Sequence, residues 1–375
     1  MRLPAAALLV VAISVSARAQ SEEPRPWSLD LTINDFGIGI GNSRHIDGLR
    51  LNFRDSAPFV AHGVNVTVWL PTREADPSEV DGLAVGVPVT GASTVRGLVV
   101  GAGTGVSKEL DGAALGLLGA GAGDRTHGIL LGGLGAGSGG TIIGIAGGGL
   151  GAGAGGDVVG ILGAGLGAGC GGDLTGIALA GLGAGAGGHV RGIVAAGLGA
   201  GAGGDLDGLA VALLAAGSGG ILQGIAVAGL GVGAGDHIRG IAVGGLGVGS
   251  GGDLVGLGIG GLGVGAGGTI RGVALGGVGV GARRIEGLTV SLGAGAQEVR
   301  GAIFAPAYFH ITENGSFEGF AIGVFNRVLG DQRGLSIGVV NYATRLHGVQ
   351  IGLVNWADNN PSGLKILPVA NVHFD

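Results

Sequence analysis

Disulfides and aromatic side chains contribute little to this chain. Cys170 is the one cysteine in 375 residues, so no intramolecular disulfide can form. Aromatic residues make up 4% of the chain, and none occurs between Trp69 and Phe304. The middle of the chain therefore has to be stabilised by packing of small aliphatic side chains and by backbone hydrogen bonds. Because its core contains no rings, we expect this part of the protein to be thin.

Charge and long apolar runs are also scarce. Charged residues make up 12% of the chain and the net charge is −6, which excludes a basic nucleic-acid surface of the usual kind. No run of about 20 bulky apolar residues is free of glycine, so we predict no membrane-spanning helix. A short apolar run at residues 5–15 follows Arg2 and precedes an A-R-A triplet and Gln20. This pattern predicts a secretory signal peptide at residues 1–19 and therefore an exported protein.

Glycine is what the chain has in abundance, with 93 residues, and its spacing is periodic. One glycine, usually preceded by a polar residue and followed by Ile, Leu or Val, begins each repeat, and we call it the marker glycine. The regular series recurs every sixteen residues at Gly128, Gly144, Gly160, Gly176, Gly192, Gly208, Gly224, Gly240, Gly256 and Gly272. Less regular copies are Gly48, Gly63, Gly82, Gly97, Gly112, Gly287, Gly301, Gly319, Gly334, Gly348 and Gly363. Repeats of this kind indicate stacked units that cannot bury an apolar face alone.

The apolar positions within a repeat predict strands. Relative to Gly176 they lie at −2, +1, +3, +6, +8 and +10, which are Leu174, Ile177, Leu179, Leu182, Ala184 and Ala186. Steps of two are strand steps, and we interpret steps of three or four as corners that keep the whole apolar set inside. Glycine at this density would cost a helix roughly 1 kcal/mol per residue. We therefore predict an all-β fold, a glycine-rich β-solenoid of about 21 coils with a 14–16-residue repeat and atypical terminal coils.

The coils should form a rod on the order of 100 Å long, since stacked strands lie ~4.8 Å apart. After the signal peptide we expect three regions. Residues 20–111 form N-terminal strands and irregular coils, residues 112–286 form regular sixteen-residue repeats, and residues 287–375 form C-terminal coils and a cap.

Glycine also dominates positions +5, +7 and +9, as at Gly181, Gly183 and Gly185. One interpretation is that these glycines relieve crowding in a tightly bent coil. The other is that they form a flat face for docking against a partner or another copy.

The C-terminal repeats contain a recurrent asparagine and resemble a known family. Asn326, Asn341 and Asn355 occur once per coil, and we interpret them as a structural ladder of side-chain amides. The run GLSIGVVNYATRLHGVQIGLVNWADNN, followed by LKILPVANVHF, resembles the bacterial surface-repeat-containing protein family of the Leptospira type. The resemblance covers about residues 319–374, and the glycine-rich middle departs from it. It implies an exported or envelope location and a β-rich repeat fold, with no enzyme activity.

No group of residues in the sequence predicts catalysis, a cofactor or a metal. The acidic position −3 is filled by aspartate in only some repeats, so we expect solvated corners and not calcium sites; these residues are Asp157, Asp173, Asp205 and Asp253. His189 and His237 lie three coils apart, about 14 Å, which is too far to share a zinc ion. Cys170 fills a position held elsewhere by alanine or serine, and we expect a small filler and not a nucleophile.

We therefore predict a non-enzymatic exported structural or surface protein of the bacterial cell surface, outer membrane or periplasm. It would present a regular β face to an unidentified protein or envelope partner, or to its own copies, and would bind no nucleic acid. The alternative is an outer-membrane β-barrel or pore, favoured by the signal peptide and the final aromatic Phe374. Against it, six- or seven-residue strands are short for a membrane and girdles of aromatic residues are absent. A third idea, an ice-binding face, lacks the ordered threonine rows it would need.

Overall fold

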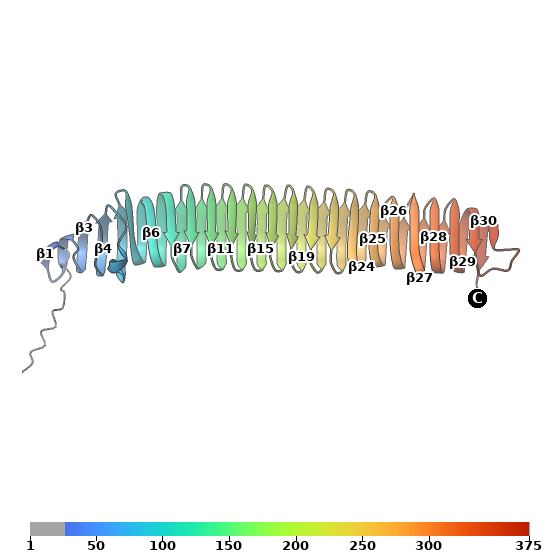
Figure 1. Cartoon of the computed structure of the whole chain (residues 1–375), viewed down its shortest axis with the longest axis horizontal. Coiled ribbons are helices and arrows are strands. Elements are labelled where there is room, and N and C mark those ends of the chain that lie inside the picture. The colour runs from blue at the N-terminus through green and yellow to red at the C-terminus, as the bar shows by residue number, and fades with distance from the viewer. Residues whose placement is uncertain (1–26, 375) are drawn as a thin grey trace, which may run out of the picture.

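The structure is a computed structural model that describes residues 27–374. The predicted signal peptide lies outside the described residues. Within them the chain is nearly all β and winds into the predicted solenoid of stacked parallel coils (Figure 1). It has about 19 turns, close to the 21 coils expected from the sequence. A short 3-10 helix, η1 (Arg73–Ala75), interrupts the strands near the N-terminal end.

The first strands form the irregular N-terminal coils: β1 (Ser28–Ile33), β2 (Phe36–Gly41), β3 (His45–Asn52), β4 (Phe59–Thr67), β5 (Ser78–Gly86) and β6 (Val89–Ala122). The regular coils contain long strands: β7 (Arg125–Gly132), β9 (Thr141–Gly148), β11 (Val158–Ala164), β13 (Leu174–Ala180), β15 (Val190–Ala196), β17 (Leu206–Ala212), β19 (Leu222–Ala228), β21 (Ile238–Gly244) and β23 (Leu254–Gly260). They alternate with short strands: β8 (Gly135–Ser138), β10 (Gly151–Ala154), β12 (Gly167–Cys170), β14 (Gly183–Ala186), β16 (Gly199–Ala202), β18 (Ala215–Ser218), β20 (Gly231–Ala234) and β22 (Gly247–Ser250). The C-terminal strands are β24 (Gly263–Gly276), β25 (Gly279–Val290), β26 (Gly293–Phe304), β27 (Tyr308–Ile322), β28 (Phe325–Ile337), β29 (Val340–Ala357) and β30 (Ile366–His373).

Each regular coil contains one long and one short strand joined by two tight turns. Long strands pair in parallel with long strands of the adjacent coils, as β13 does with β11 and β15. Short strands pair in the same way, as β14 does with β12 and β16. The register advances by sixteen residues per coil, so Gly160, Gly176 and Gly192 lie side by side. Residues at the same position of successive repeats therefore form a ladder along the rod.

The core lies between the long and the short strands and is as thin as the absence of aromatics predicted. In one coil Leu174 and Ala178 of β13 are fully buried, and Ala184 and Ala186 of β14 are nearly so. Side chains alternate across both strands, as the two-residue period of a strand requires. The core is wider near both ends of the rod. Phe59 is buried near the N-terminal end, and near the C-terminal end Phe309 pairs in register with Ala294 and is itself buried.

The predicted inward set was wrong at three positions. Ile177 is only half-buried, whereas Leu179 and Leu182 are each 46% exposed. The strand does not turn a corner at the marker glycine but continues straight through it, so positions −2, 0 and +2 share the inner face. Leu182 lies in the turn between β13 and β14 and faces outward.

Both ends of the stack close with antiparallel strands, consistent with the prediction of atypical terminal coils. β1 pairs antiparallel with β2, and β30 pairs antiparallel with β29. The prediction of a final coil at Gly363 was wrong. Gly363 has no positive φ and lies in the turns before β30, because the chain reverses direction there and does not wind another coil.

Candidate functional surfaces

The corner at position −3 is built by side chains that accept backbone hydrogen bonds from the next coil. The backbone N–H of Asp173 donates to Asp157 Oδ1 at 2.8 Å, and that of His189 donates to Asp173 Oδ1 at 2.7 Å. The pattern continues with the N–H of Asp205 donating to His189 Nδ1 at 2.9 Å. In each case an orphan donor of a tight turn gains a partner, as in an Asx turn.

This arrangement accounts for the mixture of aspartate and histidine at the corner. Both residue types place an acceptor at the same distance from the backbone, and His237 accepts the N–H of Asp253 in the same way at 2.8 Å. The oxygens that calcium would need are engaged in backbone contacts one coil apart. The structure places these residues in a ladder and does not bring them together around one point.

Cys170 occupies a core position and is not placed for nucleophilic chemistry. It pairs in register with Ala154 and Ala186 and is 9% exposed. Burial, followed by the nearby carboxylates of Asp157 and Asp173, raises the pKa of its thiol to about 11. A thiol that stays protonated at neutral pH is a poor nucleophile.

The asparagines of the C-terminal coils form the predicted ladder. Asn326 Nδ2 donates to Asn341 Oδ1 at 2.7 Å, and Asn341 Nδ2 donates to Asn355 Oδ1 at 2.7 Å. All three side chains are buried, and they also bond backbone carbonyls next to the turns. Their role is structural.

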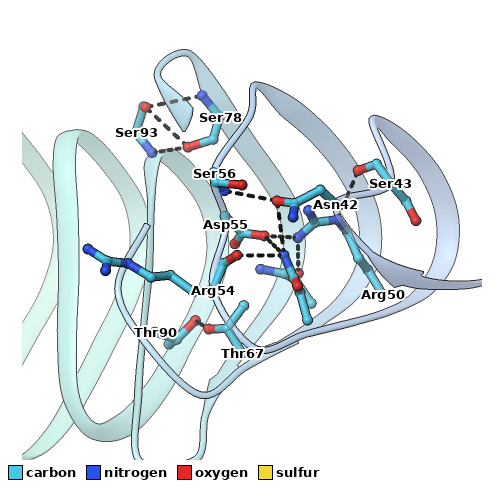
Figure 2. A network of polar contacts seen from close by, with 12 residues as sticks. Asn42, Ser43, Arg50, Arg54, Asp55, Ser56, Thr67, Ser78, Thr90 and Ser93 are labelled. Carbon is cyan, nitrogen blue, oxygen red and sulfur yellow. Dashed lines mark hydrogen bonds and ion pairs between the residues drawn. The ribbon is translucent and has the colours of Figure 1, made fainter. Parts of the chain in front are cut away.

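Beside buried aliphatic side chains such as Ile46 and Ala61, the interior of the N-terminal coils contains a buried ion pair (Figure 2). Arg50 Nη1 lies 2.5 Å from Asp55 Oδ1, and both side chains are fully buried. The guanidinium also donates to the Ser43 carbonyl and to Asn65 Oδ1, each at 3.0 Å, and stacks 3.9 Å over the Phe59 ring. The sequence analysis did not single out these residues. They form a polar plug at the end of the core.

The outer surface of the long strands carries exposed apolar side chains in rows. Ile or Leu at position +1 and aliphatic residues at +3 face solvent next to a mostly polar row at −1. A third row lies along the turn, at position +6 or, in the shorter repeat of Gly287, at +5. It consists of Leu118, Leu134, Leu150, Leu166, Leu182, Leu198, Leu214, Leu230, Leu246, Leu262, Val278 and Leu292, each 41% to 56% exposed. We call this third set the leucine row.

The outer surface of the short strands carries almost no side chains. Its residues at position +7 are Gly119, Gly135, Gly151, Gly167, Gly183, Gly199, Ala215, Gly231, Gly247, Gly263 and Gly279, and those at position +9 are Gly121, Gly137, Gly153, Gly169, Gly185, Gly201, Gly217, Gly233, Gly249, Gly265 and Gly281. Gly293 and Gly295 of the next, shorter repeat pair in register with Gly279 and Gly281 and complete the surface. We call this surface the glycine face. It lies beside the leucine row and contains no charged residue.

The glycines of the predicted strip serve two different purposes. A methyl group on Gly181, in the turn, would lie 2.0 Å from the Gly165 carbonyl oxygen, so the coil itself requires glycine there. A methyl group on Gly167, Gly183 or Gly199 would meet nothing within 4 Å. Crowding therefore explains position +5. It also explains position +9 at Gly185, where a methyl group would lie 2.3 Å from the Gly201 carbonyl oxygen, but it does not explain position +7 in these coils.

Charged residues and histidines concentrate toward the two ends in the row at position −1, where acidic residues alternate with arginine or histidine in most adjacent coils. Near the C-terminal end Arg271 Nε lies 2.8 Å from Glu286 Oε2, and this hydrogen bond holds the pKa of Glu286 below its usual value. Near the N-terminal end the row contains Asp47, His62, Asp81, Arg96, Asp111 and His127. Opposite charges on adjacent strands stabilise the register.

At the N-terminal end of the −1 row, Asp47 and His62 lie close to His45, and the sequence analysis did not predict this group. His45, Asp47 and His62 have ligand atoms within 4.8 Å of one another, and they are the one such group of three within residues 27–374. The repeats do predict part of this group. Asp47 and His62 each precede a marker glycine, so they occupy the same position of adjacent coils and must be neighbours.

Comparisons with known proteins give no further guide to this surface. No family model matches the chain, and no match was found among curated proteins or solved structures. Among the described residues, no helix is long and apolar enough to pass through a membrane.

Proposed function

We propose that this protein is a non-enzymatic, exported structural rod whose glycine face, bordered by the leucine row, binds the same surface of a second copy. The observation that carries the proposal is the open space outside the glycines at position +7. Since a single chain does not need glycine there, the absence of side chains serves something outside the coil.

The flatness of the glycine face favours an equally flat partner. Two such surfaces can approach closely over almost their whole length, because the methyl group of Ala215 is the one side chain that projects from the glycine face. The ladders on both copies have the same strand spacing, so contacts made by one coil are repeated by the next. Sheets of many strands without strong twist are commonly stabilised by stacking of this kind.

The area is sufficient for a specific interface. Four residues of short strand span about 13 Å and twelve stacked coils about 58 Å, which gives about 750 Å² for each copy. Stable complexes bury about 800 Å² on each partner. The leucine row adds exposed apolar surface along one border, and extended apolar surface marks interaction sites.

The absence of charge on the glycine face argues against a charged partner. The ion pairs of the −1 row lie on the outer surface of the long strands, away from the glycine face. A nucleic acid or an acidic polysaccharide would need basic residues on the contact surface.

The test replaces Gly183, Gly199 and Gly247 with arginine in the chain that begins at Gln20. All three positions can accept a side chain, because Gly183 and Gly199 have no neighbour within 4 Å and Gly247 has one at 3.5 Å. By light scattering after size exclusion we expect the wild type to be a dimer or larger and the variant to be a monomer.

A matched control places three arginines on the opposite surface, at Ile143, Thr175 and Gln223. These residues lie in the −1 row, in which Arg191 and Arg239 already occur. We expect this control to associate like the wild type. A monomeric wild type at about 100 µM, or equal dissociation of both variants, would refute self-association through the glycine face.

The proposed location depends on the N-terminal segment and on the resemblance of the C-terminal coils to bacterial surface-repeat proteins. We expect the mature chain to begin at Gln20 and to occur in the periplasm, the outer membrane or the cell surface of a bacterium. N-terminal sequencing of protein from fractionated cells checks both points. Recovery from the cytoplasm with residues 1–19 intact would contradict export.

A further inference from the structure

The cluster of His45, Asp47 and His62 has the geometry of a metal site. His45 and Asp47 lie two residues apart on β3, so their side chains extend from the same face of the strand. His62 on β4 pairs in register with Asp47. Asp47 Oδ1 lies 3.7 Å from His45 Nε2 and 2.7 Å from His62 Nδ1.

These distances fit a small tetrahedral ion. Zinc binds imidazole nitrogen and carboxylate oxygen at about 2.0–2.1 Å, which places neighbouring ligand atoms about 3.3 Å apart. The two measured separations lie on either side of that value. The three side chains are 42% to 47% exposed, so each can adjust by a few tenths of an ångström without disturbing the core.

The surroundings also supply an outer carboxylate that would orient one ligand. His62 Nε2 lies 3.6 Å from Asp81 Oδ2, on the side of the ring away from Asp47. Asp81 is in turn fixed by Arg96 Nη1 at 3.2 Å. A metal-binding imidazole usually donates its second ring N–H to a carboxylate, which sets the tautomer and strengthens the ligand.

We propose that His45, Asp47 and His62 bind one divalent transition-metal ion, with Zn²⁺ the best match, and that Asp81 positions His62. Two imidazoles and one carboxylate leave a fourth coordination position open to solvent. The site lies at the N-terminal end of the rod on the long-strand side and is separate from the glycine face, so it does not depend on the function proposed above.

No histidine of the regular coils has this environment. His127 occupies the same −1 position and lies 3.3 Å from Asp111, but the residue at its −3 position is Arg125. A cation there disfavours a metal ion. His189 and His237 each accept a backbone N–H through Nδ1. His127 is therefore a matched control with one imidazole and one carboxylate.

The experiment titrates Zn²⁺ into the untagged chain that begins at Gln20, by isothermal titration calorimetry at pH 7.5. We expect one high-affinity site in the wild type. His45→Ala and His62→Ala should each weaken binding at least 100-fold, and Asp81→Asn about 10-fold to 100-fold, the usual effect of an outer ligand. His127→Ala should bind like the wild type.

Circular dichroism and melting temperature show whether each variant keeps its fold, and Co²⁺ provides a second readout through the visible absorption of a tetrahedral site. Zn²⁺ should raise the melting temperature of the wild type and of His127→Ala but not that of His62→Ala. Absence of binding to the wild type at 100-fold excess Zn²⁺ would overturn the proposal. So would loss of binding in His127→Ala equal to that in His62→Ala.

Discussion

At the scale of single residues, the marker glycine shows how closely adjacent coils approach. Gly176 has φ +133°, and a methyl group added to it would lie 2.0 Å from the carbonyl oxygen of Gly160. The same close approach recurs at the marker glycines from Gly48 to Gly348. Neither the backbone conformation nor the space admits another residue, so the glycine that identifies the repeat in the sequence is also its strictest structural requirement.

Alanine at Gly176 should therefore be strongly destabilising. We expect a loss of about 3 kcal/mol or more, because the residue would combine a strained backbone with a steric clash. Urea denaturation followed by circular dichroism measures the change. Gly183→Ala, in the same coil but facing open space, should stay within about 0.5 kcal/mol of the wild type. Equal tolerance of both substitutions would contradict the packing described here.

The thiol of Cys170 should react slowly in the folded protein. Its raised pKa, about 11, keeps it protonated at pH 8, and only the thiolate reacts with alkylating reagents. We expect modification by iodoacetamide at pH 8 to be at least 100-fold slower than in 6 M guanidinium chloride. Mass spectrometry over time gives both rates, and rapid labelling of the native protein would disprove the buried position.

At the scale of the strand and turn, side chains of one coil complete the hydrogen bonding of the next. The Asp and His residues at position −3 accept backbone N–H groups at the turns. The Asn ladder instead donates to backbone carbonyls inside the C-terminal coils. Both sets of side chains supply hydrogen bonds to backbone groups at or next to the turns. The turn of the regular coil thus depends on an acceptor one coil earlier.

Asp173→Ala should loosen the turn that contains His189. Loss of one hydrogen bond costs about 1 kcal/mol, which corresponds to roughly fivefold faster exchange of the His189 amide. Asp173→Asn keeps an oxygen at the same position and should restore slow exchange. Hydrogen exchange measured by NMR or mass spectrometry distinguishes the two variants. If asparagine failed to rescue the alanine phenotype, the acceptor role would be wrong.

At this scale the sequence predicted the stacking and its register but not which side chains face inward. A sixteen-residue period fixes the neighbours of every residue, as at Gly160, Gly176 and Gly192. Hydrophobicity then suggested that Ile177, Leu179 and Leu182 are buried. They are not, because one or two larger aliphatic side chains and a few small ones per coil already fill the thin core, and the remaining apolar residues lie on the surface.

The same reasoning explains what was missed among the candidate sites. His45, Asp47 and His62 lie in the irregular N-terminal coils, where the spacing of marker glycines is not sixteen. Their proximity follows from the alignment of Gly48 with Gly63, which the sequence provides, and from side-chain directions, which it does not.

At the scale of the whole molecule, the rod has two closed ends of different construction. The C-terminal end combines buried aromatic rings, the Asn ladder and the antiparallel β30. The N-terminal end places the Arg50–Asp55 ion pair inside the coils and covers the last parallel strand with β1. Each end thus terminates a stack whose middle repeats one coil many times.

Asp55→Ala should release the N-terminal coils from this rod. Removing one partner of a buried ion pair leaves an uncompensated charge and costs about 3–5 kcal/mol. We expect amide exchange in β2, β3 and β4 to accelerate at least 100-fold while β13 and β15 stay protected. Asp111→Ala, an exposed member of the −1 row, should leave exchange in all these strands unchanged. Equal acceleration of amide exchange in all strands of the rod would contradict a stabilising effect of the Arg50–Asp55 ion pair that is confined to the N-terminal coils.

Because antiparallel strands close both ends of the stack, the length of the rod is set by the number of repeats between them. Each interior repeat presents the same register to the repeats before and after it, so excision of residues 176–191 would join compatible partners and shorten the molecule by ~4.8 Å. Gain or loss of whole repeats would change its reach in equal increments while both ends stay intact. The number of repeats in the sequence thus determines the length of the molecule in steps of one coil.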